Sequence, residues 1–131
     1  MFGNAADEKP LPKVLHRIDS LIGPGSHVEG EVTFTGGLRV DGRICGNVVV
    51  PAEETGTLAI GEFGVVDGDV RVTHLVVDGT INGSVYVEDF VELRPKARVT
   101  GDVHAGTLEM QSGAVVDGHV ISRSNSSVSS V

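Results

Sequence analysis

Five histidines and a single cysteine are the side chains here that could bind a metal or act as a nucleophile. The histidines are His16, His27, His74, His104 and His119. None lies two or four residues from another, so a zinc site would need ligands gathered from distant parts of the chain. Cys45 has only Arg43 close in sequence to lower its thiol pKa. We therefore expect solvated surface histidines, a cysteine that is a small wall residue, and no metal.

Paired acidic residues are the second chemical feature. Asp67 and Asp69 straddle a glycine, as do Glu29 and Glu31, and such pairs resemble the two carboxylates of some hydrolases. The arrangement recurs along the chain, which is typical of a solvated wall. The sequence also lacks Gly-Lys-Ser/Thr and Gly-x-Gly-x-x-Gly, so neither phosphate-binding loop is present. These observations predict a protein that is not an enzyme and that uses neither nucleotide nor cofactor.

Composition narrows the functional class further. The 131 residues carry a formal charge of −8 without a Lys/Arg cluster, which argues against nucleic-acid binding. One cysteine cannot form an internal disulfide, and this suits a reducing cytoplasm. The sequence has no long apolar run near its start or elsewhere, so we expect neither a cleaved signal nor a membrane span. With no Trp, one Tyr and four Phe, the core must be aliphatic.

The elements that would position these residues follow from a repeat. The pattern [Val/Ile]-x-Gly-x-Val occurs six times, at 28–32, 44–48, 66–70, 81–85, 99–103 and 116–120. Apolar residues two apart indicate β-strands with one buried face. The central glycine falls on the buried side, where it allows a sharp bend or a close approach between chain segments. Each copy therefore predicts a strand that turns a corner.

Extending the alternation backwards gives six units, at 20–34, 38–50, 58–72, 75–87, 91–105 and 108–122. No unit could bury its apolar face alone, so the units must stack. Three short strands per turn fit the spacing, and successive turns would pair as parallel strands. The sequence thus predicts an all-β, single-stranded parallel β-helix of about six rungs over residues 20–122. Its handedness does not follow from the periodicity.

The chain ends differ from the repeats. Residues 1–19 are polar and contain proline, and we expect a flexible tail whose last turn, with Val14 and Leu15, covers the first rung. A more specific alternative is that the tail contacts a membrane through Met1 and Phe2. Residues 123–131 are rich in serine and should be disordered.

The last unit is no more polar than the internal ones, so no capping repeat hides the end of the column. Uncovered strand edges and apolar columns should then bind another copy. We predict end-to-end polymerisation through the first and last rungs. The expected interface consists of Ile22, Val28, Val32, Phe34, Leu108, Met110, Val116 and Val120.

The opening and the repeats resemble those of the bactofilins, a family of bacterial cytoskeletal proteins. The matching stretches are Leu21-Ile22-Gly23-Pro24-Gly25, Val28-Glu29-Gly30, Leu38-Arg39-Val40-Asp41-Gly42-Arg43-Ile44-Cys45-Gly46-Asn47-Val48 and the later glycine-centred repeats. The resemblance implies a right-handed β-helix and filaments that form without nucleotide through head-to-head and tail-to-tail junctions. It further implies a cytoplasmic scaffold on the inner membrane that positions cell-wall enzymes or other cell-shape proteins, with inner-membrane proteins among the expected partners. Met1-Phe2-Gly3 fits the membrane-targeting start of many members, although Asp7 and Glu8 follow it.

Two other functions remain open from the sequence. A left-handed hexapeptide-repeat acyltransferase would form a trimer of fixed size, and short six-residue steps such as Ile60-Gly61 resemble its repeat. The step is not sustained, because the chain returns to period two after each such pair. A non-polymerising adaptor that binds partners on flat β-walls is the other alternative. Sedimentation and electron microscopy distinguish both from a polymer.

Overall fold

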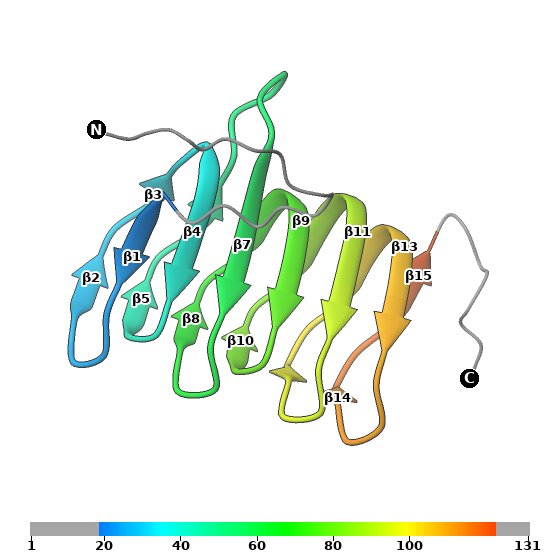
Figure 1. Cartoon of the computed structure of the whole chain (residues 1–131). Coiled ribbons are helices and arrows are strands. Elements are labelled where there is room, and N and C mark those ends of the chain that lie inside the picture. Colours follow the sequence, from blue (N-terminus) through cyan, green and yellow to red (C-terminus); the bar gives the residue numbers. More distant parts are fainter. Residues whose placement is uncertain (1–18, 123–131) are drawn as a thin grey trace, which may run out of the picture.

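The computed structural model describes residues 19–122, and these form a column of six stacked rungs (Figure 1). Every regular element in this range is a β-strand, and all strand pairs are parallel. The rungs comprise residues 20–33, 36–49, 56–72, 74–87, 90–105 and 107–122. The prediction of an all-β parallel solenoid of about six turns is confirmed. The predicted units agree with the rungs to within two residues at each boundary.

Each rung has three strands, one on each of three walls. The first wall contains β1 (Ser20–Ile22), β4 (Gly36–Val40), β7 (Gly56–Ile60) and the second halves of β9 (Val70–Val77), β11 (Val85–Leu93) and β13 (Val103–Met110). The second wall contains β2 (His27–Glu29), β5 (Arg43–Cys45), β8 (Val65–Asp67), β10 (Thr80–Asn82), β12 (Arg98–Val99) and β14 (Val115–Val116). The third wall contains β3 (Val32–Thr33), β6 (Val48–Val49), the first halves of β9, β11 and β13, and β15 (Val120–Ser122).

Aliphatic columns fill the interior because the register aligns the inward residues of successive rungs. One column runs through Leu38, Leu58, Leu75, Val91 and Leu108, and another through Ile44, Val66, Ile81 and Val99. All nine side chains are buried. Full burial of such a side chain contributes about 1.5 to 3 kcal/mol, so these columns are the main source of stability. The aliphatic core predicted from the composition is thus present.

A column of glycines forms the corner between the second and third walls. A Cβ on Gly46 would collide with the carbonyl oxygen of Gly30, and one on Gly68 would collide with that of Gly46. The chain can turn this corner in every rung only because these positions lack side chains. The corner predicted from the repeated glycine therefore has a packing reason as well as a conformational one.

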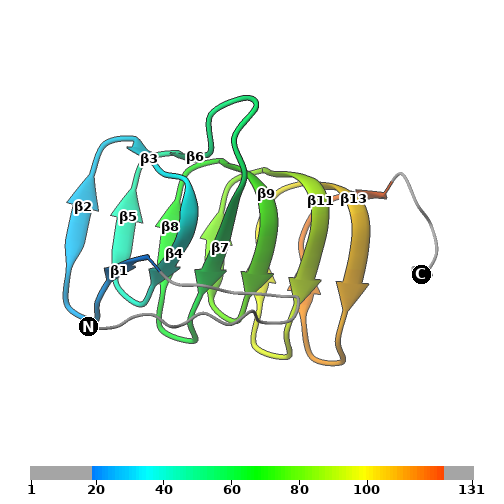
Figure 2. The same ribbon diagram turned by 45° about the horizontal axis from the view of Figure 1, so that its top comes forward.

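The longest connection is the loop at 51–55, which projects from the corner between the third and first walls (Figure 2). Within it, the backbone N–H of Glu54 donates to the carbonyl oxygen of Pro51 at 3.1 Å. At its end, the N–H of Gly56 donates to the hydroxyl of Thr73, the one buried polar side chain among residues 19–122. The loop is thereby fixed to the third rung.

Candidate polymer interface and outer walls

Within residues 19–122, the first rung leaves one edge of each of its three strands without a partner. Strands β1, β2 and β3 pair only with β4, β5 and β6. The predicted interface residues Ile22, Val28, Val32 and Phe34 all belong to this end. Each packs against the core on one side and remains half-buried. This end therefore presents both open backbone edges and partly exposed apolar side chains.

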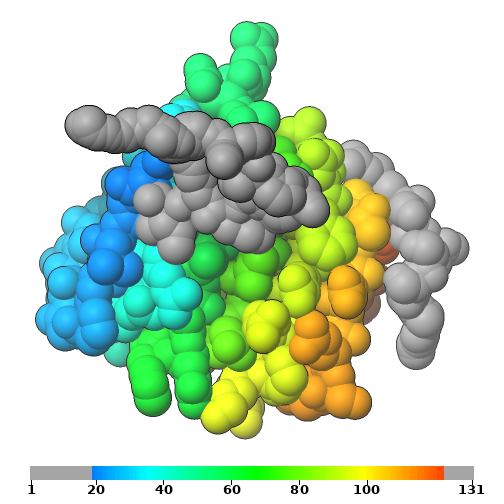
Figure 3. All heavy atoms as spheres, viewed as in Figure 1, coloured from blue at the N-terminus to red at the C-terminus, as the bar shows by residue number. Residues whose placement is uncertain are grey.

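The sixth rung forms the opposite end, shown in orange in Figure 3. Among the strands that the structure describes, β14 pairs only with β12, and β15 only with β13. Met110 is 46% exposed and Val120 is 40% exposed, while Val116 is half-buried. Leu108 differs, because it exposes only 4% of its surface and belongs to the core. The structure thus brings Met110, Val116 and Val120 together on the rung whose outer edge is open, with Leu108 beneath them.

Three exposed apolar residues on the terminal rungs were not predicted. They are Leu21, which is 60% exposed, Val115 and Ile121. Each lies next to an inward residue in a strand, so its side chain points outwards from the wall. The signal was available in the sequence, since two adjacent apolar residues in a period-two strand cannot both point inwards. Leu21 thus adds exposed apolar surface beside the interface residues of the first rung, and Val115 and Ile121 add it beside those of the sixth.

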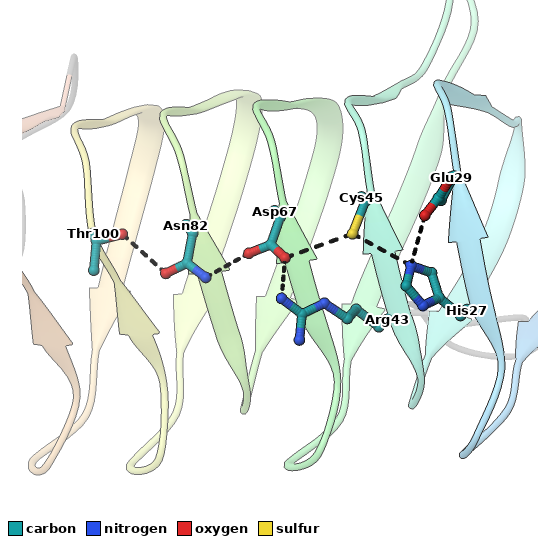
Figure 4. Close-up of polar contacts among 7 residues, drawn as sticks. All are labelled: His27, Glu29, Arg43, Cys45, Asp67, Asn82 and Thr100. Atoms are coloured by element: carbon teal, nitrogen blue, oxygen red, sulfur yellow. Dashed lines mark hydrogen bonds and ion pairs between the residues drawn. The ribbon is translucent and has the colours of Figure 1, made fainter.

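A polar ladder crosses the rungs on the second wall (Figure 4). The Thr100 hydroxyl donates to Asn82 Oδ1 at 3.1 Å, and Asn82 Nδ2 donates to Asp67 Oδ1 at 2.7 Å. Arg43 Nη2 contacts the other oxygen, Asp67 Oδ2, at 2.5 Å. These residues come from four successive rungs, so the ladder fixes the register of the wall from outside. The hydrogen bond from Asn82, followed by that from Arg43, lowers the pKa of Asp67.

Cys45 lies in the same column and is half-buried. Its Sγ is 3.5 Å from His27 Nε2 and 3.8 Å from Asp67 Oδ2. Within residues 19–122, no group of three or more His, Cys, Asp or Glu side chains is placed to hold a metal ion. The His119 side chain is strongly exposed and that of His27 is about half exposed, whereas His74 and His104 are half-buried. His16 lies outside the described range.

A second row of polar side chains supports the glycine corner. Asn47 Oδ1 accepts a hydrogen bond from the backbone N–H of Asp69. Asp69 Oδ1 in turn accepts one from the backbone N–H of Ser84, and Asp102 Oδ1 accepts one from the backbone N–H of His119. Each acceptor therefore satisfies a donor in the next rung. The backbone N–H of His119, followed by its ring, lowers the pKa of Asp102. Asp67 and Asp69, one of the two acidic pairs considered as catalytic candidates, thus belong to structural rows.

Comparison with known proteins decides the family. The family model described as "Bactofilin: Polymer-forming cytoskeletal" matches residues 20–121, which is the whole column except its last residue. The chain belongs to the bactofilin family. Bactofilin BacO of Myxococcus xanthus (strain DK1622) is 26% identical over 102 residues, which cover 78% of each chain. No solved structure matches.

The bactofilin family is a structural one, so the prediction that the chain is not an enzyme is confirmed. The family description also establishes that bactofilins form polymers, and hence that members of the family self-associate. In the described part of the chain, no helix is long and apolar enough to cross a membrane. The membrane-contact candidates Met1 and Phe2, with the predicted tails, lie outside the described residues.

Proposed function

We propose that this bactofilin chain assembles end to end, through both terminal rungs, into filaments that need no nucleotide. The observation that carries the proposal is that both ends combine open strand edges with half-buried or exposed apolar side chains. An exposed edge strand is a template for pairing with another chain. Joining two ends would satisfy these backbone groups and bury the apolar columns. The eight predicted interface residues, with Leu108 as support from beneath, form the two contact surfaces.

The filaments have no polarity in this proposal, because like ends meet. A junction between two first rungs or between two sixth rungs is related by a two-fold axis, so the same patch serves both subunits. Alternating the two kinds of junction extends the polymer without limit. The support for this finer statement is the family resemblance together with the presence of two open ends.

The filament acts as a scaffold in the cytoplasm, on the inner face of the cytoplasmic membrane, where it positions cell-wall enzymes or other cell-shape proteins. The continuous walls support this role, since each subunit offers the same outer surfaces at regular intervals along the filament. Met1 and Phe2 provide the peripheral membrane contact in this proposal.

Negative-stain electron microscopy of the purified chain without nucleotide tests the proposal. Threads are expected, and added ATP or GTP should not change their number or length. Val116→Arg should abolish the threads and leave a β-rich circular dichroism spectrum. Phe63→Arg is the matched control, because it adds the same charge at an exposed turn far from either end. Monomers or dimers of the unmodified chain would instead support a non-polymerising adaptor.

A further inference from the structure

A groove of about 590 Å³ runs along the third wall beside the projecting loop. Its lining extends from Val49 in the second rung to Ile121 in the sixth, and the loop residues 51–54 form one side. Five rungs at about 4.8 Å spacing make it roughly 19 Å long. An extended peptide of about six residues has this length. The groove lies on the outer side of the wall, away from the inward columns of the terminal rungs.

The floor of the groove is a stack of three side chains from successive rungs. The Tyr86 and His104 rings are parallel, with centroids 4.8 Å apart and an interplanar angle of 8°. The Arg71 guanidinium lies over the opposite face of Tyr86, 4.9 Å from its centroid. Both faces of the tyrosine ring are thus covered, so the floor offers ring edges and N–H or O–H donors.

The side of the groove is acidic and already formed. Glu53 and Glu54 are exposed on the loop, and Glu88 adds a third carboxylate to the lining. The turn that closes on Pro51 and the bond from Gly56 to Thr73 hold the loop in place. A binding site whose walls are fixed beforehand loses less conformational entropy when a ligand binds.

We propose that this groove binds a short, extended, basic segment of a partner protein. Floor donors match the backbone carbonyl oxygens of an extended peptide, and the loop carboxylates match Lys or Arg side chains. The apolar residues Val49 and Ile121 at the two ends accommodate aliphatic side chains. The net charge of −8 also favours a cationic ligand.

The proposal rests on the scaffolding role proposed above, and it names the chemistry of the recruited partner. It does not depend on how subunits join, because every subunit carries its own groove. A filament would therefore display the grooves in a regular array, and a partner with two or more basic segments would gain avidity.

The proposal is tested by selecting peptides that bind the immobilised full chain. The peptides come from an unbiased phage-displayed library and are about ten residues long. Recovered peptides should be rich in Lys and Arg. One synthetic representative is then titrated by fluorescence anisotropy against variants of the full chain. Tyr86→Ala should weaken binding by about tenfold or more, and Glu54→Lys by about fivefold or more. The matched control Glu62→Lys makes the same charge change at a different corner and should alter affinity by less than about twofold.

Two results would overturn the groove as a basic-peptide site: recovered peptides that are acidic or share no composition, or binding that is as tight for Glu54→Lys and Tyr86→Ala as for the unmodified chain. Each variant is also pelleted by ultracentrifugation. Variants that pellet normally but lose peptide binding support the groove. A chain that binds peptide yet never pellets would contradict the proposed filament and leave the groove intact.

Discussion

The backbone of Gly83 lies directly against the carbonyl oxygen of Gly68 in the rung below, with no room for a side chain between them. The same contact recurs from rung to rung at this corner. The rungs can therefore pack this closely only because glycine, which has no side chain, occupies the position.

Gly83→Ala should therefore destabilise the column by about 3 kcal/mol or more, because the backbone of one rung would have to move. Gly23→Ala is the control, since a Cβ there meets nothing within 4 Å, and it should change stability by less than about 0.5 kcal/mol. Urea unfolding measures both changes, with each variant made in a chain that also carries Val32→Arg and Val120→Arg, so that assembly through either end does not contribute. Equal effects of the two substitutions would contradict the packing account of the corner.

Glu53 has a φ of 72°, the only positive value among non-glycine residues 19–122. It occupies the third position of the turn that closes from Glu54 to Pro51, where glycine is favoured. Glu53→Gly should stabilise the chain by up to about 1 kcal/mol by removing this strain. Glu54→Gly should give no such gain. Thermal unfolding of the two variants tests the difference, and a destabilising Glu53→Gly would show that the strain is negligible.

Acid should weaken the rung-to-rung ladders. The pKa values of Asp67 and Asp102 are lowered in the folded chain, chiefly by Asn82 and by the N–H of His119. Their stabilisation is thus present above the unfolded pKa of about 3.9 and is lost as pH falls through the lower folded pKa. Urea unfolding at several pH values below about 5 should show this loss. The Asp67→Asn variant should lose less stability than the unmodified chain over the same pH range. An identical loss in both chains would show that Asp67 does not contribute to the acid sensitivity.

Salt should strengthen assembly. Each subunit carries a charge of −8, and Glu29 and Glu31 in the first rung would face their own copies at a two-fold junction. Raising ionic strength from 0.01 to 0.15 M shortens the screening length from about 30 to about 8 Å. The critical concentration for pelleting should therefore fall. A critical concentration that rises with salt would indicate junctions held by ion pairs between opposite charges.

Most of the fold could be predicted from the sequence because the information is local and repeated. Period-two aliphatic runs identify the strands, and the glycine in each copy marks the same corner. The number of rungs and their boundaries follow from counting these copies. The predicted end residues also lie on the terminal rungs, since a one-dimensional stack leaves no other place for the first and last units.

The features that could not be predicted depend on side-chain conformation and on the connectors. Arg71, Tyr86 and His104 each directly follow a copy of the repeat, so the sequence places them side by side on one wall, but it does not show that their side chains stack. The contact between Cys45 and His27 likewise depends on the conformations of the two side chains. Loop 51–55 falls between the predicted units 38–50 and 58–72, and the bond from Gly56 to Thr73 at its end joins residues that are distant in sequence.

The central claim is that both terminal rungs are interfaces between like ends. Sedimentation velocity of Val32→Arg and Val120→Arg tests it most directly, with circular dichroism to confirm folding. If like ends meet, each single variant should stop at dimers joined through its unmodified end, and the double variant should be a monomer. Single variants that are only monomers would contradict non-polar filaments, because a head-to-tail junction uses both ends. Single variants that still form long polymers would contradict the terminal rungs as the interface.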